Sequence, residues 1–288
     1  MSIAKILAPL TGGARDMAVL SAAFVAAEPF AAHIAAIFVR PDPAEVMPFF
    51  GEGISGPVLQ EIVDVAERAS DHALADAKAT LTKAAAEARA EILDVPEKKD
   101  GVTVSLRETE GHFADEITRA SALSDLVVFG PLIETDKPGL TEAFETVLLE
   151  AGRPVLLTAR TPPSSFAKRI AIGCDSSIAL AHALTASLPY LKQADSVELF
   201  TICRANEESQ SCCDARDYLA LHGISSTERE VDPGARAIGA AILDCAADCN
   251  ADLLVLGGYA HSRLRQTLFG GVTRHVVSHA QVPLFLVH

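Results

Sequence analysis

Two pairs of glycines frame a short loop near the end of this 288-residue chain. The stretch ADLLVLGGYAHSRLRQTLFGG, residues 251–271, begins with an apolar run that ends at Gly257 and Gly258 and finishes at Gly270 and Gly271. Glycine has no side chain, so it lets a backbone bend sharply or approach another group closely. The loop between the pairs contains arginine and no acidic residue. This combination predicts a backbone that approaches a negatively charged ligand.

The distribution of charge favours an anion site in this loop. The chain has a net charge of −14, yet residues 253–288 contain no Asp or Glu. They contain Arg263, Arg265, Arg274 and several histidines. Residues 130–150, the corresponding stretch of the first half, are rich in acids. The second half would therefore attract a phosphate that the first half would repel. The alternative interpretation is that the arginines form only a solvated helix face.

Strands and helices alternate along the whole chain and must position this loop. The strands predicted in the first half are 3–9, 31–39, 102–108, 125–130 and 154–159, and the helices are 14–27, 57–91, 112–122 and 140–150. The strands predicted in the second half are 169–174, 196–202, 225–230, 252–257 and 283–287, with helices between them. The apolar runs lack alternation of period two, which is typical of strands buried on both faces. We therefore predict an α/β fold in which each half is a five-stranded parallel sheet with helices on both faces.

The same order of elements occurs twice. In SDLVVFG and ADLLVLG, Asp125 and Asp252 each precede an apolar strand that ends in glycine. Each stretch continues through a loop and a helix to a closing strand, which begins after Pro154 or Pro283. Upstream, KILAPLTGG of the first half corresponds to RIAIGCDSS of the second. The halves differ chiefly in the second helix, which is much longer in the first half. We infer a tandem repeat of one domain.

A linker separates the two repeats. TARTPPSSFAKR, residues 158–169, contains a proline pair and a serine pair, which favour a loop. We therefore expect an N-terminal domain at residues 1–160 and a C-terminal domain at 168–288. The last strand of each sheet is an edge that needs a partner, so we expect the halves to pack as an intramolecular pseudo-dimer. A homodimer and an unidentified protein partner are further expectations, whereas the acidic net charge argues against nucleic acid.

The glycine loop also resembles the signature of a known family. Gly-x2-Gly-x9-Gly-(Ser/Thr) is the signature of the universal stress protein superfamily, one subclass of which binds ATP. Gly257 matches its first glycine and Gly270 its third, while Ala260 replaces the second and Gly271 stands at the hydroxyl position. CDSS resembles the family's Asp-Gly-Ser turn after the first strand, which matches Asp175 to the acid that contacts the adenosine. The resemblance covers the whole chain and implies two tandem Rossmann-like domains of the universal stress protein type.

The resemblance implies a nucleotide site in the C-terminal domain. Asp175 would hold the ribose or adenine side, and backbone amides near both glycine pairs would hold phosphate. The ligand-binding residues predicted in this way are Asp175, Gly257, Gly258, Ala260, His261, Ser262, Arg263, Gly270, Gly271 and Val272. The expected ligand is ATP or another adenine nucleotide, accompanied by Mg²⁺. Because Gly271 lacks the hydroxyl of the signature, weak ATP binding, binding of AMP or ADP, and no nucleotide binding all stay open.

The N-terminal domain has a degenerate version of the same site. LTGG places Thr11 at the position of the acid. After Gly130, Ala143 and Phe144 replace the later glycine and the hydroxyl residue of the signature. We therefore expect at most one nucleotide site per chain.

These features predict a cytoplasmic stress-response protein that acts as a binding and regulatory module rather than as a metabolic enzyme. One alternative is a slow ATP hydrolase or phosphotransferase that uses the same pocket. The other is a nucleotide-free scaffold, or a carrier of an apolar ligand beneath VMPFF at residues 46–50. No G-x-S-x-G or HExxH motif occurs, and no nucleophile has an assignable base, so we predict no catalytic residue. GEGISG at 51–56 matches G-x-G-x-x-G, but it does not follow a strand directly and Glu52 would repel phosphate, so a loop cap is the better interpretation.

Three further patterns bear on location and metals. The six cysteines form no C-x-x-C pair, which favours reduced thiols in a reducing compartment. The apolar stretch 17–39 has Glu28 and Pro29 at its centre, so it is predicted to be a helix joined to a buried strand rather than a membrane span. His275 and His279 lie four residues apart on one predicted helix. The two interpretations of this pair are half of a zinc site and a pair with a structural role.

Overall fold

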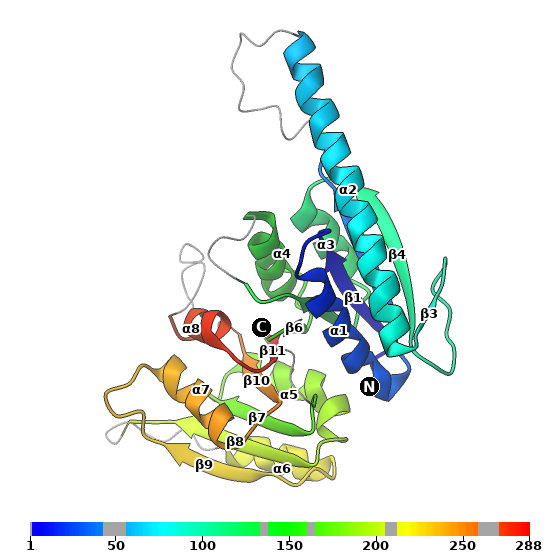
Figure 1. The fold of residues 1–288 in the computed structure, drawn as a ribbon. Coiled ribbons are helices and arrows are strands. Elements are labelled where there is room, and N and C mark those ends of the chain that lie inside the picture. Colours follow the sequence, from blue (N-terminus) through cyan, green and yellow to red (C-terminus); the bar gives the residue numbers. More distant parts are fainter. Residues whose placement is uncertain (1, 43–55, 133–137, 160–164, 205–211, 259–270) are drawn as a thin grey trace. The chain divides into compact units, whose positions relative to one another are not determined.

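The structure is a computed structural model that describes residues 2–42, 56–132, 138–159, 165–204, 212–258 and 271–288. The chain divides into two compact units (Figure 1). The N-terminal unit comprises Ala4–Val128 and Lys137–Val147, and the C-terminal unit comprises Met1–Ile3, Phe129–Asp136 and Leu148–His288.

The N-terminal unit contains a parallel sheet in the order β3-β4-β2-β1-β5. Its strands are β1 (Lys5–Leu10), β2 (His33–Arg40), β3 (Glu91–Ile92), β4 (Thr103–Glu110) and β5 (Leu126–Phe129). The helices of the first repeat are α1 (Asp16–Ala27), the 3₁₀ turn η1 (Glu28–Phe30), α2 (Gly56–Ala88), α3 (Phe113–Ser121) and α4 (Pro138–Leu149). Residues in the centre of the sheet, such as Ile6, Ile34 and Val127, are fully buried, as strands covered on both faces require.

The C-terminal unit contains a sheet in the order β6-β11-β10-β7-β8-β9. Its strands are β6 (Val155–Leu157), β7 (Arg169–Cys174), β8 (Ser196–Ile202), β9 (Thr227–Val231), β10 (Leu253–Gly257) and β11 (Leu284–Val287). Its helices are α5 (Ile178–Leu191), α6 (Cys213–Leu221), α7 (Ile238–Asp248) and α8 (Gly271–His279). The pairs from β11 to β9 are parallel, whereas β6, the last strand of the first repeat, pairs antiparallel with β11.

The two repeats share one strand order. The first strand of each repeat lies between the second strand and the strand before the last. In the first repeat β1 lies between β2 and β5, and in the second β7 lies between β8 and β10. In open α/β sheets the chain changes direction at this point, and ligands bind there beyond the carboxyl ends of the strands. The topology therefore predicts a ligand site at the carboxyl ends of β1 and β5 in one unit, and of β7 and β10 in the other.

The aspartates that mark the sequence repeat have the same role in both units. Asp125 Oδ2 accepts hydrogen bonds from the backbone N–H groups of Ala4 and Lys5, at 2.8 and 3.0 Å. Asp252 Oδ1 accepts from those of Lys168 and Arg169, at 2.9 and 2.8 Å. The carboxylate of Asp125 thus fixes the start of β1 to the start of β5, and that of Asp252 fixes the start of β7 to the start of β10. The sequence repeat is a structural repeat.

The predicted α/β fold is confirmed, and the 11 strands of the described residues form a mostly parallel sheet that is consistent with two tandem domains, although they are not divided as five parallel strands in each half. The helix and strand predicted within residues 17–39 are α1 and β2, joined by the turn that contains Glu28. The two-residue strand β3 and the antiparallel pairing of β6 were not predicted. No helix in the described ranges combines the length and the apolar character needed to cross a membrane.

Candidate functional site

The turn that follows β7 holds Asp175 beside the start of α5. The backbone N–H of Ser177 donates to Asp175 Oδ1 at 3.1 Å, and the N–H of Leu180 donates to Ser177 Oγ at 3.0 Å. Ser177 is therefore the N-cap of α5, a position that favours serine because its oxygen satisfies a helix N–H. Ser176 has φ +54°, the left-handed conformation that glycine adopts most easily. Asp175, Ser176 and Ser177 thus form a turn in which Ser176 takes the position of the glycine in the Asp-Gly-Ser turn that the residues resemble.

Gly257 brings the end of β10 against this helix start. A Cβ atom on Gly257 would lie 2.6 Å from the backbone nitrogen of Leu180 and 2.9 Å from the carbonyl carbon of Ala179. Only glycine fits such a close approach of two backbones. Asp175 and Gly257 therefore both lie at the first turn of α5, at the carboxyl ends of neighbouring strands. The close approach made by Gly257 is to this helix.

Gly258 has its backbone groups paired within the C-terminal unit. Its N–H donates to the carbonyl of Val287 at 2.7 Å, and its own carbonyl lies 3.0 Å from Nδ1 of His288. A Cβ atom at this position would lie 3.3 Å from a methyl carbon of Leu148, which is tighter than an ordinary contact. Gly258 thus fixes the chain as it leaves β10.

The second glycine pair is described only at its last member. The helix α8 begins at Gly271, where the sequence predicts a helix start. A Cβ atom on Gly271 would have no neighbour within 4 Å, and Val272 is exposed. The predicted site residues Ala260, His261, Ser262, Arg263 and Gly270 lie outside the described residues. So do the VMPFF segment and most of GEGISG.

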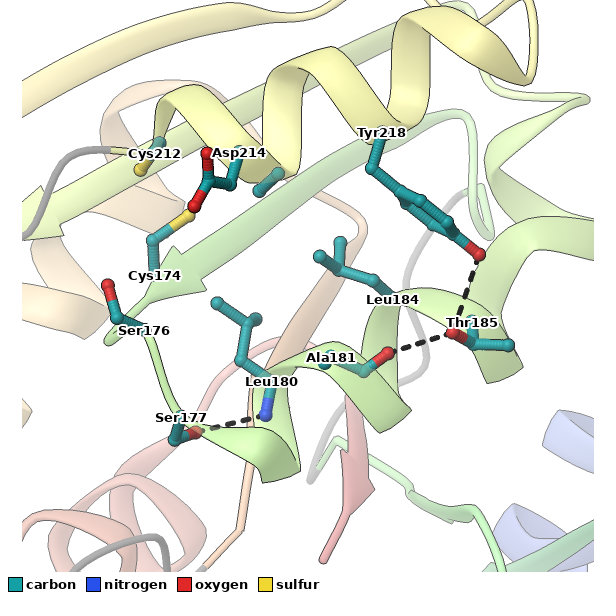
Figure 2. A pocket seen from close by; sticks show the side chains of 11 residues that line it. Cys174, Ser176, Ser177, Leu180, Ala181, Leu184, Thr185, Cys212, Asp214 and Tyr218 are labelled. Atoms are coloured by element: carbon teal, nitrogen blue, oxygen red, sulfur yellow. Dashed lines mark hydrogen bonds between the residues drawn. The ribbon is translucent and has the colours of Figure 1, made fainter.

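A pocket of about 340 Å³ lies between α5 and α6 in the C-terminal unit (Figure 2). One of its ends is the turn after β7, and at the other end Thr185 Oγ1 of α5 lies 3.4 Å from the hydroxyl of Tyr218 on α6. Most of its wall is apolar, with thiols, hydroxyls and one carboxylate added. Its lining residues are Cys174, Ser176, Ser177, Leu180, Ala181, Leu184, Thr185, Cys212, Asp214, Ala215 and Tyr218.

Sequence reasoning missed this pocket. Cys174, Cys212 and Tyr218 belong to three separate elements and follow no spacing that marks a site. Only the proximity of Ser176 and Ser177 to the predicted Asp175 could have indicated it. The pocket adjoins the expected nucleotide turn, and its size falls in the range of small-molecule sites.

Comparison with known proteins finds a family similarity for the C-terminal half. Residues 165–288 match the family model described as "Universal stress protein family". This part of the chain is similar to the universal stress protein family. A search of curated protein sequences found no match.

Two of the solved structures of universal stress proteins share the fold of nearly the entire chain. A universal stress protein from Archaeoglobus fulgidus has 16% identity and a TM-score of 0.68, covering 98% of this chain and 95% of its own. A putative universal stress protein from Pseudomonas aeruginosa has 14% identity and a TM-score of 0.57, covering 99% and 93%. A universal stress protein solved in complex with cAMP has 24% identity and a TM-score of 0.34, covering 42% and 96%.

The first repeat has a different turn after its first strand. Asp16 is buried, and its carboxylate accepts hydrogen bonds from the N–H groups of Thr11 and Gly12, at 3.0 and 2.8 Å, and from the hydroxyl of Thr11 at 3.1 Å. Burial raises the pKa of Asp16, although these hydrogen bonds oppose the shift. Gly12 has φ +72°, and a Cβ atom there would lie 2.2 Å from the carbonyl oxygen of Ala73 on α2. The backbone of α2 thus covers this turn.

The histidine pair predicted from the sequence lies on α8. The rings of His275 and His279 stack with centroids 4.3 Å apart, and Nδ1 of His279 lies 2.8 Å from the carbonyl oxygen of His275. His275 also packs against Gly239 of α7, where a Cβ atom would lie 2.9 Å from its side chain. Within the described ranges, no group of three or more His, Cys, Asp or Glu residues could hold a metal ion. The contacts of the pair are those of a structural pair that joins α7 to α8.

Proposed function

We propose that this protein is a stress-response binding and regulatory protein whose C-terminal unit binds an adenine nucleotide. The observation that supports the proposal most is the convergence of Asp175, the capped start of α5 and Gly257 at the switch point between β7 and β10. Open α/β sheets bind ligands at this point, and a helix N-terminus favours an anion.

Each part of the nucleotide has a place in this proposal. Asp175 accepts hydrogen bonds from the ribose, and the adjacent pocket between α5 and α6 takes the apolar base. The phosphates lie toward the loop between Gly257 and Gly271, whose sequence is basic and without acids. Mg²⁺ accompanies the phosphates.

The same reasoning limits the protein to one site per chain. In the N-terminal unit, the carboxylate of Asp16 accepts from the backbone of the turn, and Ala73 of α2 lies directly on Gly12. A nucleotide could enter there only if α2 moved away from the turn. We expect the first repeat to have a structural role.

The antiparallel pairing of β6 with β11 supports an intramolecular pseudo-dimer. It joins the last strand of the first repeat to the last strand of the second, so neither strand is an open edge. The six cysteines form no C-x-x-C pair, which supports a reducing compartment such as the cytoplasm.

Calorimetric titration of the full chain with ATP, ADP and AMP tests this function. We expect at most one site per chain, with a binding constant weakened about tenfold or more by Asp175→Ala, because one hydrogen bond to a charged group is lost. Thr11→Ala, the matched change in the first repeat, should leave binding unchanged. Circular dichroism of both variants verifies that they are folded. Two equivalent sites, no binding of any of the three nucleotides, or a loss confined to Thr11→Ala would contradict the proposal.

A further inference from the structure

Two thiols meet at one end of the pocket. Cys174 is the last residue of β7, and Cys212 is the N-cap residue of α6. Figure 2 shows their sulfur atoms near each other beside Asp214. Both side chains line the pocket although Cys174 is 8% exposed and Cys212 only 6%. They are thus shielded from bulk solvent but face a space that a small molecule can enter.

The surroundings give the two thiols different roles. The hydrogen bond with Cys174 lowers the pKa of Cys212 to about 7, against the effect of burial, and the hydroxyl of Thr201 at 2.9 Å acts in the same direction. Cys212 also lies at the N-terminus of α6, where the helix dipole stabilises an anion, while the charge of Glu228 opposes it. The same hydrogen bond and burial raise the pKa of Cys174. Its place at the start of α6 and the lowered pKa favour Cys212 as the more readily ionised thiol of the pair, whereas the raised pKa of Cys174 favours its protonated form.

The other buried thiols of the C-terminal unit provide a contrast. Burial raises the pKa of both Cys245 and Cys249, which holds them as neutral thiols. Cys213, adjacent to Cys212, is exposed on the surface of α6. Since the thiolate is the nucleophile in cysteine chemistry, reactivity toward small oxidants should concentrate at Cys212.

We propose that Cys174 and Cys212 form a peroxide-reactive dithiol in which Cys212 attacks the oxidant and Cys174 resolves the product to a disulfide. The sulfur of Cys212 attacks hydrogen peroxide, an S–O bond forms, the O–O bond breaks, and the hydroxide that leaves is protonated to water. The thiol of Cys174 then loses its proton and attacks the sulfenic acid, an S–S bond forms, and the S–O bond breaks with release of the second water. The two thiols lose two electrons in total, and one peroxide is reduced to two waters.

This disulfide would connect the end of β7 to the start of α6. Both elements contribute residues to the lining of the pocket beside Ser176. The proposal does not depend on nucleotide binding, because it rests only on the two thiols and the space that they face.

Treatment of the full-length protein with an equimolar amount of hydrogen peroxide tests the proposal. We expect the wild-type chain to lose two titratable thiols, and non-reducing peptide mapping to recover a Cys174–Cys212 cross-link that dithiothreitol reverses. In Cys174→Ser, dimedone should trap a sulfenic acid at Cys212, because the resolving thiol is absent. In Cys212→Ser, oxidation should slow by about tenfold or more. Cys245→Ser is the matched control and should behave as the wild type.

The mapping on the wild-type chain decides the proposal even if a variant fails to fold. A cross-link between two chains through Cys213, dimedone at Cys213 instead of Cys212, or no intramolecular cross-link at all would overturn it. A folded Cys212→Ser variant that reacts as fast as the wild type would overturn it as well.

Discussion

The turns that follow β1 and β7 occupy the same place in two repeats of one fold, but their interactions differ. After β1, the carboxylate of Asp16 folds back onto Thr11 and Gly12, and the backbone of α2 lies on Gly12. After β7, Ser176 takes the left-handed position, and Ser177 caps α5. The first turn is covered by its own unit, whereas the second lies at the end of a pocket.

The helix after the second strand accounts for this difference. In the first repeat α2 has 33 residues and reaches across the turn, whereas α6 of the second repeat has 9 residues. The strand order, the anchoring aspartates and the connections are otherwise shared. The length of one helix thus converts the same switch point from a structural contact into a candidate binding site.

The largest expected effect comes from replacing Gly12. In Gly12→Ala, the new Cβ would lie 2.2 Å from the carbonyl oxygen of Ala73 and 2.6 Å from its carbonyl carbon, and φ +72° is unfavourable for alanine. Because backbone atoms of α2 must move, we expect the free energy of unfolding to fall by about 3–5 kcal/mol. Urea denaturation followed by circular dichroism measures this change.

The matched change in the second repeat is Ser176→Gly. It relieves the left-handed strain at Ser176 but adds freedom to the unfolded chain, so stability should change by less than about 1 kcal/mol. If Gly12→Ala unfolded at the same urea concentration as the wild type, α2 would not lie on the first turn. The comparison between the two turns would then be wrong.

Much of the fold could be predicted because its signals are local or repeated. Apolar runs, the proline that precedes each closing strand, and the paired Asp125 and Asp252 follow the chain order, and the strands occur where these patterns indicate. Gly257 was predicted to let the backbone approach a negatively charged ligand, and the close contact in the structure is instead with the first turn of α5.

The features that were missed depend on contacts between elements far apart in sequence. Cys174 and Cys212 meet only because β7 and α6 are brought together by the sheet, and no spacing of cysteines reveals this. Asp16 was not distinguished as the acid of the first turn, since the signature places Thr11 there. Glu145 is one of the acids of the stretch 130–150, and the structure buries it in α4, which the acid-rich sequence did not indicate.

Glu145 is a buried acid of α4, the helix that follows β5 in the first repeat. Its Oε1 is buried and has no hydrogen-bond partner among the described residues. Burial, with a smaller effect from Glu142, raises the pKa of Glu145 from 4.5 to about 7. The folded state therefore binds this proton more tightly than the unfolded state. Its contribution to stability is complete below about pH 4.5 and is lost as the pH rises to about 7.

Glu145→Gln removes this titration and should make stability less dependent on pH. We expect the variant to be more stable than the wild type by about 2 kcal/mol at about pH 8, with a much smaller difference at about pH 5. Urea denaturation at both pH values measures it. Glu150→Gln, an exposed acid just after α4, is the control and should follow the wild type. An equal effect of Glu145→Gln at both pH values would show that the carboxyl does not titrate in this range.

The smallest expected effect concerns the cap of α5, which distinguishes the second turn from the first. Ser177 Oγ accepts the N–H of Leu180 at 3.0 Å, whereas the N-cap residue of α1, Arg15, makes no side-chain cap. Ser177→Ala leaves that N–H without its acceptor and should lower the free energy of unfolding by about 1 kcal/mol. Ser177→Asp keeps an oxygen acceptor and adds a negative charge at the helix N-terminus, so it should retain most of the stability. If Ser177→Ala unfolded at the wild-type urea concentration while Ser177→Asp was destabilised, the cap would contribute nothing. The shape of the second turn would then depend on the hydrogen bond between Asp175 and the backbone of residue 177.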